Sequence, residues 1–287
     1  MINFSGRAIQ LCPVCGGSGE KMPPHPEVLL YRCGRCTHCF GIEREPASKD
    51  IYGKDYFEVH HRNWFAHPNL ALFDTILGAL SRFGCSTVLD VGCGNGNFLR
   101  HAAKNLPETA LTGIDIKPPQ PAGPFRFVGH DLSRESLGEI FDAVISLAVI
   151  EHIDDVQLFL DRMIESCADD GLIVIMTVSN DGLVYRLARL LRRIGFGSAY
   201  DRLYSRHHLN HFSKASLGHL LRSRNLRVLE VYSHNSPIDA VDYPANSEVM
   251  TVFYRLALQV LFALGRLTGA TLLQTSVCVK DTGPRSR

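Results

Sequence analysis

Three glycines and an aspartate are the first residues whose types and spacing could do chemistry. Residues 88 to 96 read Val-Leu-Asp-Val-Gly-Cys-Gly-Asn-Gly, an apolar run followed by a glycine-rich loop. Glycine lets the backbone turn tightly and approach a ligand, and the amides at the start of the next helix face that ligand. The pattern predicts a binding loop made of Asp90, Gly92, Cys93, Gly94, Asn95 and Gly96.

Two more aspartates end the next two predicted strands. Asp115 lies in Gly-Ile-Asp-Ile, where a carboxylate can accept hydrogen bonds from both hydroxyls of a ribose. Asp131 lies in Gly-His-Asp-Leu and could accept from an adenine amino group. Helix capping is the alternative role for each aspartate. The Gly-x-Gly-x-Gly spacing, with Asp90 two residues ahead of it, disfavours a pyrophosphate and favours a cationic, sulfonium cofactor.

Residues 84 to 178 resemble a class I S-adenosylmethionine-dependent methyltransferase, through the glycine loop and Phe-Asp-Ala-Val-Ile-Ser-Leu-Ala-Val-Ile-Glu-His-Ile at 141 to 153. The resemblance implies a seven-stranded sheet whose last strand is antiparallel. It also implies that the glycine loop surrounds the methionine part of S-adenosylmethionine. The residues expected around the ribose and adenine and along the rest of the site are Asp115, Ile116, Asp131, Leu132 and Leu147.

Three histidines are candidate catalytic residues: His152, His208 and His211. His152 follows the fourth strand at the mouth of the predicted cleft, and it could act as a base or orient the acceptor. A structural contact or a helix cap is the alternative. His208 and His211 belong to a stretch that the resemblance implies lies close to the site, and with His207 they could instead bind a metal. No Asn/Asp-Pro-Pro-Tyr follows the fourth strand, which favours an oxygen or carbon acceptor.

The first forty residues hold five of the nine cysteines. Cys12-Pro-Val-Cys15 and Cys36-Thr-His-Cys39 are two Cys-x-x-Cys pairs, the ligand supply of a tetrahedral structural zinc site. Cys33 offers a competing pair with Cys36, and His25 and His38 are further alternatives.

A second resemblance favours the pair Cys36 and Cys39. The run from 36 to 46, followed by Ile-Tyr-Gly-Lys-Asp-Tyr-Phe at 51 to 57, is similar to the zinc-ribbon head of bacterial methyltransferases often called methyltransferase 23-like. The expected domains are therefore a zinc ribbon at 1–46 and a methyltransferase domain at 47–287.

Alternating strand and helix patterns predict a doubly wound, Rossmann-like α/β fold. Several strands are continuous apolar runs, as in parallel sheets covered on both faces. Strands are expected at 87–91, 110–116, 125–128, 141–147, 172–178, 227–233 and 275–280, and helices at 69–83, 97–105, 156–167 and 214–224.

Two long connections, 180–212 and 234–271, interrupt this alternation and are interpreted as insertions. Residues 181–227 contain ten Lys or Arg and two Asp, a net charge of +8 in a chain whose total is +1. Apolar residues at 183–194 and 249–267 predict helices that could form a homodimer interface, a lid, or a peripheral contact with a membrane. Arg255 and Arg266 argue against a full membrane span.

These patterns predict methyl transfer from S-adenosylmethionine to a small, anionic or lipid-linked acceptor. The first residues lack the pattern of a signal peptide, so a cytoplasmic location is expected, with the inner membrane face as an alternative. The near-neutral total charge makes a nucleic-acid partner an unfavoured interpretation. The rival functions are an RNA methyltransferase and an inactive zinc-ribbon interaction protein.

Overall fold

A computed structural model of the chain describes residues 10–43, 62–116, 122–243 and 247–281. Its main sheet has seven strands: β4 (Thr87–Val91), β5 (Ala110–Asp115), β6 (Arg126–Gly129), β7 (Phe141–Leu147), β8 (Cys167–Val178), β10 (Leu226–His234) and β11 (Leu273–Lys280). They lie in the order β10-β11-β8-β7-β4-β5-β6. β11 is antiparallel to both of its neighbours, β10 and β8, and the other neighbouring pairs of this sheet are parallel. The expected α/β sheet with an antiparallel last strand is confirmed.

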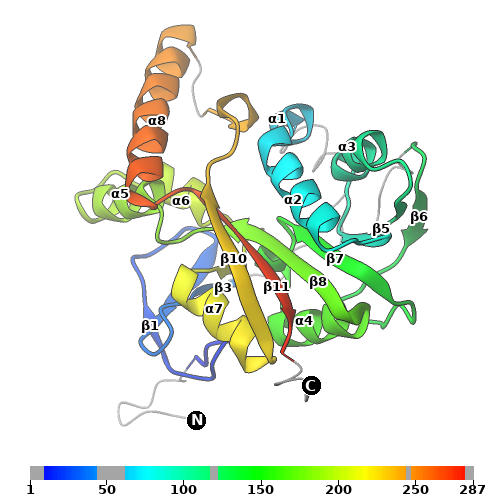
Figure 1. The fold of residues 1–287 in the computed structure, drawn as a ribbon. Coiled ribbons are helices and arrows are strands. Elements are labelled where there is room, and N and C mark those ends of the chain that lie inside the picture. The colour runs from blue at the N-terminus through cyan, green and yellow to red at the C-terminus, as the bar shows by residue number, and fades with distance from the viewer. Residues whose placement is uncertain (1–9, 44–61, 117–121, 244–246, 282–287) are drawn as a thin grey trace.

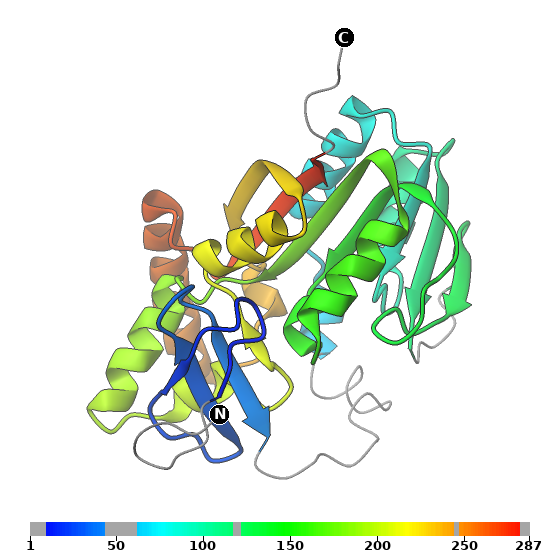
Figure 2. The same cartoon turned by 90° about the horizontal axis from the view of Figure 1, so that it is seen from below.

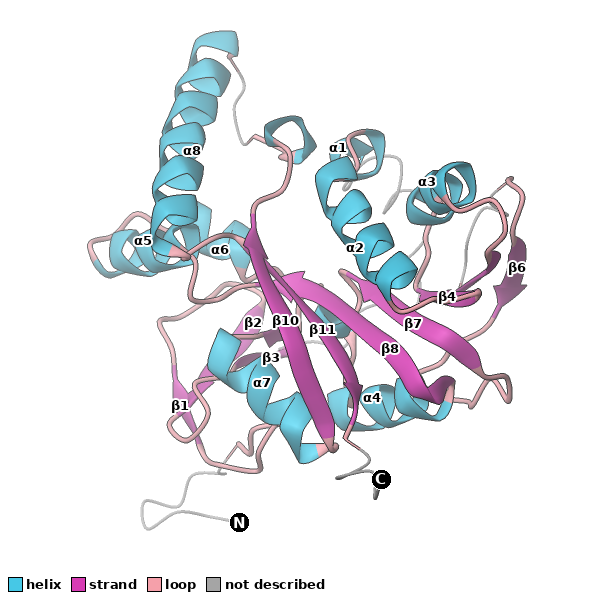
Figure 3. Cartoon of the chain, viewed as in Figure 1, coloured by secondary structure: helices cyan, strands magenta, loops and turns pink. Residues whose placement is uncertain are grey.

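Helices cover both faces of this sheet (Figure 3). One face carries α2 (Leu70–Arg82) and α3 (Asn97–Asn105), and the other carries α4 (Val156–Glu165) and α7 (Lys214–Ser223). Successive side chains of a strand point to opposite faces. Val88 accordingly packs in the core with α2, whereas Leu89 packs in the core with α4 and α7. This double burial explains why the strand is apolar without alternation.

The largest differences from the predicted boundaries lie between α4 and β8. The helix expected to reach residue 167 ends at Glu165, and Cys167 already pairs with Phe141 as the first residue of β8. The register between β7 and β8 then shifts before Ala143 pairs with Leu172. This irregularity places polar residues inside the strand, which the apolar run at 172–178 did not predict.

A second, four-stranded sheet is built by the N-terminal segment, where no strands were predicted. It consists of β1 (Gly19–Lys21), β2 (Val28–Cys33), β3 (Cys39–Glu43) and β9 (Asn210–His211). The fourth strand comes from the first insertion, since Cys39 pairs with His211 and Phe40 with Asn210. Figure 2 shows the three N-terminal strands of this sheet, in blue, beside the helices of the first insertion and away from β6. The expected domain boundary at 46/47 lies outside the described residues.

The first insertion contains α5 (Leu183–Arg193) and α6 (Ser198–Leu203) as well as β9. Arg189 connects its parts, because Nη1 donates to the backbone and side-chain oxygens of Asn180 and to the hydroxyl of Tyr204. His25 of the N-terminal segment contacts the carbonyl of Asp201 at 3.0 Å. The insertion is thus held between the two sheets.

The second insertion contains η3 (Ile238–Ala240) and α8 (Glu248–Thr268). Ser247 is the N-cap of α8, and its side chain accepts a hydrogen bond from the amide of Met250. Gly269, with a positive φ of 68°, is the C-cap. The helix projects from the body of the molecule beyond α5 (Figure 1). Phe262 and Gly265 are its buried residues, so most of α8 faces outward.

Candidate active site

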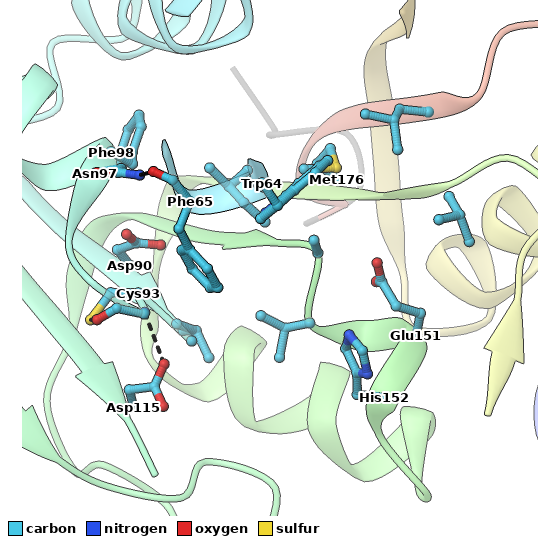
Figure 4. Close-up of a pocket in the computed structure, with 18 of the residues that line it drawn as sticks. Trp64, Phe65, Asp90, Cys93, Asn97, Phe98, Asp115, Glu151, His152 and Met176 are labelled. Carbon is cyan, nitrogen blue, oxygen red and sulfur yellow. Dashed lines mark hydrogen bonds between the residues drawn. The ribbon is translucent and has the colours of Figure 1, made fainter. Parts of the chain in front are cut away.

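A cavity of about 780 Å³ lies at the carboxyl ends of β4, β5 and β7. Open α/β sheets bind their ligands at this edge. Every predicted cofactor residue except Gly96 lines it: Asp90, Gly92, Cys93, Gly94, Asn95, Asp115, Ile116, Asp131, Leu132 and Leu147. Gly96 instead caps the start of α3 with φ 77°. Figure 4 shows Asp90, Cys93 and Asp115 at one end of the cavity and Glu151 and His152 at the other.

The glycine loop has the geometry that its sequence predicts. Gly92 and Gly94 have φ values of 71° and 53°, which side chains other than glycine rarely adopt. The amide of Gly94 donates to Oδ2 of Asp115 at 2.9 Å, which ties the loop to the end of β5 (Figure 4). A Cβ at Gly92 would lie 2.3 Å from Cγ2 of Val149. Glycine at this position therefore keeps the loop close to the cavity wall.

The Asp90 carboxyl is fully buried beneath this loop, with a relative exposure of 2%. Burial, and then the charge of Asp115, raise the pKa of Asp90 from 3.8 to about 8. A buried carboxylate becomes easier to ionise when a cation lies beside it. This end of the cavity is therefore suited to a positively charged ligand group.

Glu151, His152 and His208 lie together at the other end. Glu151 and His152 belong to η2 (Ile150–His152), and His208 comes from the first insertion. The rings of His152 and His208 meet edge to face, with centroids 4.7 Å apart. Glu151 is 1% exposed, and burial raises its pKa to about 7.

His211 does not lie at this site, and the structure corrects its expected role. The side chain is fully buried outside the cavity lining, and its ring contacts Tyr204 at a centroid distance of 4.5 Å. Burial lowers the pKa of His211 to about 3, so the ring is neutral. Its backbone pairing with Cys39 joins the first insertion to the N-terminal strands as part of the four-stranded sheet.

Several cavity residues were not predicted from the sequence. Trp64 and Phe65 of α1 (Arg62–Ala66) line the cofactor end, where the side-chain amide of Asn97 donates to the backbone carbonyl of Phe65 at 2.8 Å (Figure 4). Arg202 of α6 and Asp242 also line the cavity, and Nη2 of Arg202 donates to the backbone carbonyl of Asp242 at 2.7 Å. The sequence feature that could have drawn attention to this region is Trp64, because it is the single tryptophan among 287 residues.

Comparison with known proteins gives a consistent result. A family described as a methyltransferase domain matches residues 30–231, which is more than half of the chain. The chain belongs to this methyltransferase family. It is an S-adenosylmethionine-dependent methyltransferase.

Individual relatives are distant. An uncharacterized methyltransferase of Mycobacterium tuberculosis is 29% identical over 134 residues, covering 44% of this chain and 68% of the relative. A malonyl-[acyl-carrier protein] O-methyltransferase of Acetivibrio thermocellus is 26% identical, covering 42% of this chain and 47% of the relative. The solved structure StiE O-MT superposes with a TM-score of 0.50 at 13% identity, covering 74% and 75% of the two chains. This last likeness concerns the fold alone.

The residues of the methyltransferase fit its cofactor. The loop around Gly92 leaves a cradle that a Cβ would fill, and Asp90 lies where a cationic group would be favoured. Asp115 and Asp131 line the cavity at the ends of successive strands, as hydroxyl and amino groups of an adenosine require. S-adenosylmethionine, when bound, supplies an activated methyl group. The protein then has to hold donor and acceptor in line.

Four cysteines of the methyltransferase form a separate cluster. The sulfur atoms of Cys12, Cys15, Cys33 and Cys36 lie within 4.8 Å of one another. Cys12 and Cys36 are 3.6 Å apart, and Cys15 and Cys33 are 3.5 Å apart. Four thiolates around one zinc ion have sulfur atoms about 3.8 Å apart, given Zn–S bonds of about 2.3 Å. The cluster could hold such an ion with all four of its coordination positions occupied by cysteine sulfurs.

The four-cysteine cluster contains Cys33 where Cys39 was expected. Cys39 is fully buried in β3, and its sulfur accepts from the side-chain amide of Asn180 at 3.1 Å. The alternative ligands His25 and His38 also have other partners. Nε2 of His38 contacts Oδ1 of Asn210 at 3.0 Å, and His25 contacts Asp201. The structure therefore places Cys33, and not the preferred Cys39, beside Cys36, which favours the alternative pair Cys33 and Cys36.

Proposed function

We propose that the methyltransferase methylates an oxygen or carbon atom of a small anionic molecule. The observation that carries this proposal is the shared cavity, which joins the cofactor residues to Glu151, His152, His208 and Arg202. A histidine pair can take up or orient a hydroxyl proton, and the guanidinium of Arg202 favours an acceptor with negative charge.

Two further observations support an oxygen acceptor. The segment after β7 reads Ala-Val-Ile-Glu-His, without the Asn/Asp-Pro-Pro-Tyr of enzymes that methylate planar amines. Relatives named as malonyl-[acyl-carrier protein] O-methyltransferase and, in Rickettsia conorii, ubiquinone biosynthesis O-methyltransferase are oxygen-directed by name. Hydroxylated carboxylates are therefore the first acceptors to test.

Two measurements test the proposal. Calorimetry should show one S-adenosylmethionine per chain, and Asp115→Ala should weaken that binding at least about tenfold, because a ribose bond to a charged acceptor is lost. Radiolabelled methyl transfer to a panel of hydroxylated carboxylates should then give product. Failure of S-adenosylmethionine to bind contradicts the cofactor assignment. Transfer to RNA and to no small molecule contradicts the acceptor class.

We propose that the four-cysteine cluster binds a structural zinc ion. The closed donor set supports this role, because a catalytic zinc keeps an open position. The N-terminal strands contain three to six residues each. Segments this small need a metal or another staple to fold. Zinc would thereby hold β3 against β9 and fix the insertion that carries His208.

We propose that α8 attaches the enzyme peripherally to an anionic membrane. Its 21 residues are long and apolar enough to cross a bilayer by length and composition, but Arg255 and Arg266 interrupt them. Phe253 and Leu256 are 62% and 57% exposed. Exposed Arg186 and Arg193 on neighbouring α5 add the positive charge that attracts anionic lipid. A lipid-linked acceptor would then be presented at the surface where the enzyme is held.

Vesicle flotation tests this attachment. The protein should float with phosphatidylglycerol-containing vesicles, and Phe253→Ser with Leu256→Ser should abolish flotation without changing S-adenosylmethionine binding. A concentration-dependent dimer that is broken by the same substitutions, with no flotation, would instead assign 183–194 and 249–267 to a homodimer interface.

A further inference from the structure

Glu151, His152 and His208 form a second group of metal-ligating side chains. Their ligand atoms lie within 4.8 Å of one another. Bonds of about 2.1 Å to a metal bring ligand atoms to about 3.0–4.2 Å from one another in octahedral geometry, so small side-chain movements suffice. The group lies on the cavity wall at the end opposite the glycine loop (Figure 4).

Neighbouring groups orient two of these side chains. The hydroxyl of Thr177 donates to Oε2 of Glu151 at 2.8 Å. Nδ1 of His152 lies 2.6 Å from the carbonyl oxygen of His207. Because a carbonyl only accepts, Nδ1 carries a proton, and Nε2 is the ring nitrogen through which His152 would bind a metal. Metal-binding histidines and carboxylates have partners of this kind.

The burial of Glu151 distinguishes this group from a surface cluster. Its side chain is 1% exposed beneath the cavity wall, while His152 and His208 are half-buried and line the cavity. A carboxylate removed from water is stabilised by a cation that it contacts directly. Imidazole and carboxylate together suit Mn²⁺, Fe²⁺, Co²⁺ and Zn²⁺, whereas the four-cysteine cluster suits soft ions.

We propose that Glu151, His152 and His208 bind one divalent cation, and that this cation holds the acceptor through its oxygen atoms. Three protein ligands leave coordination positions open toward the cavity. Two neighbouring oxygens of one molecule, as in a vicinal diol or a hydroxy acid, can occupy two such positions. The acceptor part of this inference rests on the proposed function, whereas the metal site does not.

Manganese titration of the full-length, zinc-loaded protein tests the site. Electron paramagnetic resonance of free Mn²⁺ should show one bound ion per chain. Glu151→Gln preserves the shape of the side chain and an acceptor for Thr177, and it should weaken Mn²⁺ binding by roughly tenfold or more. His208→Ala should do the same. His207→Ala is the matched control, because the contact with Nδ1 of His152 comes from the backbone carbonyl of residue 207, which alanine keeps, and it should leave Mn²⁺ binding unchanged.

Water-proton relaxation tests the open positions. Bound Mn²⁺ should enhance the relaxation rate, because water occupies positions that the protein leaves free. Absence of enhancement overturns the acceptor-holding role. Absence of stoichiometric Mn²⁺ binding, or equal binding by Glu151→Gln with unchanged folding by circular dichroism, overturns the metal site.

Calorimetry with S-adenosylmethionine on the same samples separates the two proposals. If S-adenosylmethionine binds and Mn²⁺ does not, the cation site alone fails. If Mn²⁺ binds and S-adenosylmethionine does not, the proposed function fails, together with the acceptor-holding role, and the metal site stands.

Discussion

Because Asp90 is buried, we predict that S-adenosylmethionine binds more tightly as pH rises from 6 to 8. The pKa of Asp90 is raised to about 8, first by burial and then by Asp115. The resemblance places the cationic methionine part beside Asp90, so binding favours the ionised carboxylate. A pKa of 8 makes the ionised fraction about 1% at pH 6, about 9% at pH 7 and about 50% at pH 8. The affinity should therefore rise about ninefold and then about fivefold over these two steps.

The same shift has a cost for the unliganded protein. A raised carboxyl pKa contributes stability that is complete below pH 3.8 and is lost as pH rises toward 8. At pH 7 the loss is about 4 kcal/mol, at about 1.4 kcal/mol for each pKa unit. Asp90→Asn should remove this dependence, so its free energy of unfolding should fall less than that of the wild type between pH 4 and 8.

Calorimetry at pH 6, 7 and 8 measures the affinities, and urea unfolding without cofactor measures the stability. Asp90→Asn should bind S-adenosylmethionine weakly and without the rise between pH 6 and 7. The α-amino group of the cofactor titrates near 8 and is about half neutral at pH 8, so its loss of charge reduces the rise between pH 7 and 8 from about fivefold to about threefold and leaves the rise between pH 6 and 7 almost unchanged. Equal dissociation constants at pH 6 and 7 in the wild type, or the same rise in Asp90→Asn, would refute the reasoning.

Two other predictions concern the loop and the cysteines. Gly92→Ala should weaken S-adenosylmethionine binding at least about tenfold and destabilise the protein by about 1–3 kcal/mol, because the new Cβ meets Val149 at a positive φ. Calorimetry and urea unfolding measure both, and Gly34→Ala, which meets nothing within 4 Å, should change neither. Cys33→Ser should reduce the zinc content measured by mass spectrometry to well below one ion per chain and lower the melting temperature. Cys39→Ser should keep the zinc, and equal zinc loss in both variants would contradict the cluster.

The cofactor end of the site was predictable because its residues are local. Asp90 and Asp115 lie at the carboxyl ends of β4 and β5, and the glycine loop and Asp131 come shortly after β4 and β6. Parallel strands bring these ends to one edge of the sheet. Recognising the strands was therefore enough to place these residues together. Strand type was also readable, because burial on both faces leaves a continuous apolar run.

The acceptor end was less predictable because its residues are far apart in the chain. His208 reaches His152 only because the first insertion folds back between the two sheets, held by Arg189 and by the pairing of β9 with β3. His211 has the same residue type and lies three positions later, yet it points into the core. Sequence spacing does not distinguish these two histidines, since their environments come from other segments.

The sequence by itself determined the sheet, the glycine loop and the class of cofactor, because these depend on local patterns and on the rule that parallel strands end at one edge. Tertiary structure alone decided between Cys33 and Cys39. Both have suitable spacing, but the hairpin of β2 and β3 turns the sulfur of Cys33 toward Cys15 and buries that of Cys39 against Asn180. It also brought Glu151, His152 and His208 together, because contacts between distant segments depend on packing that no local pattern encodes.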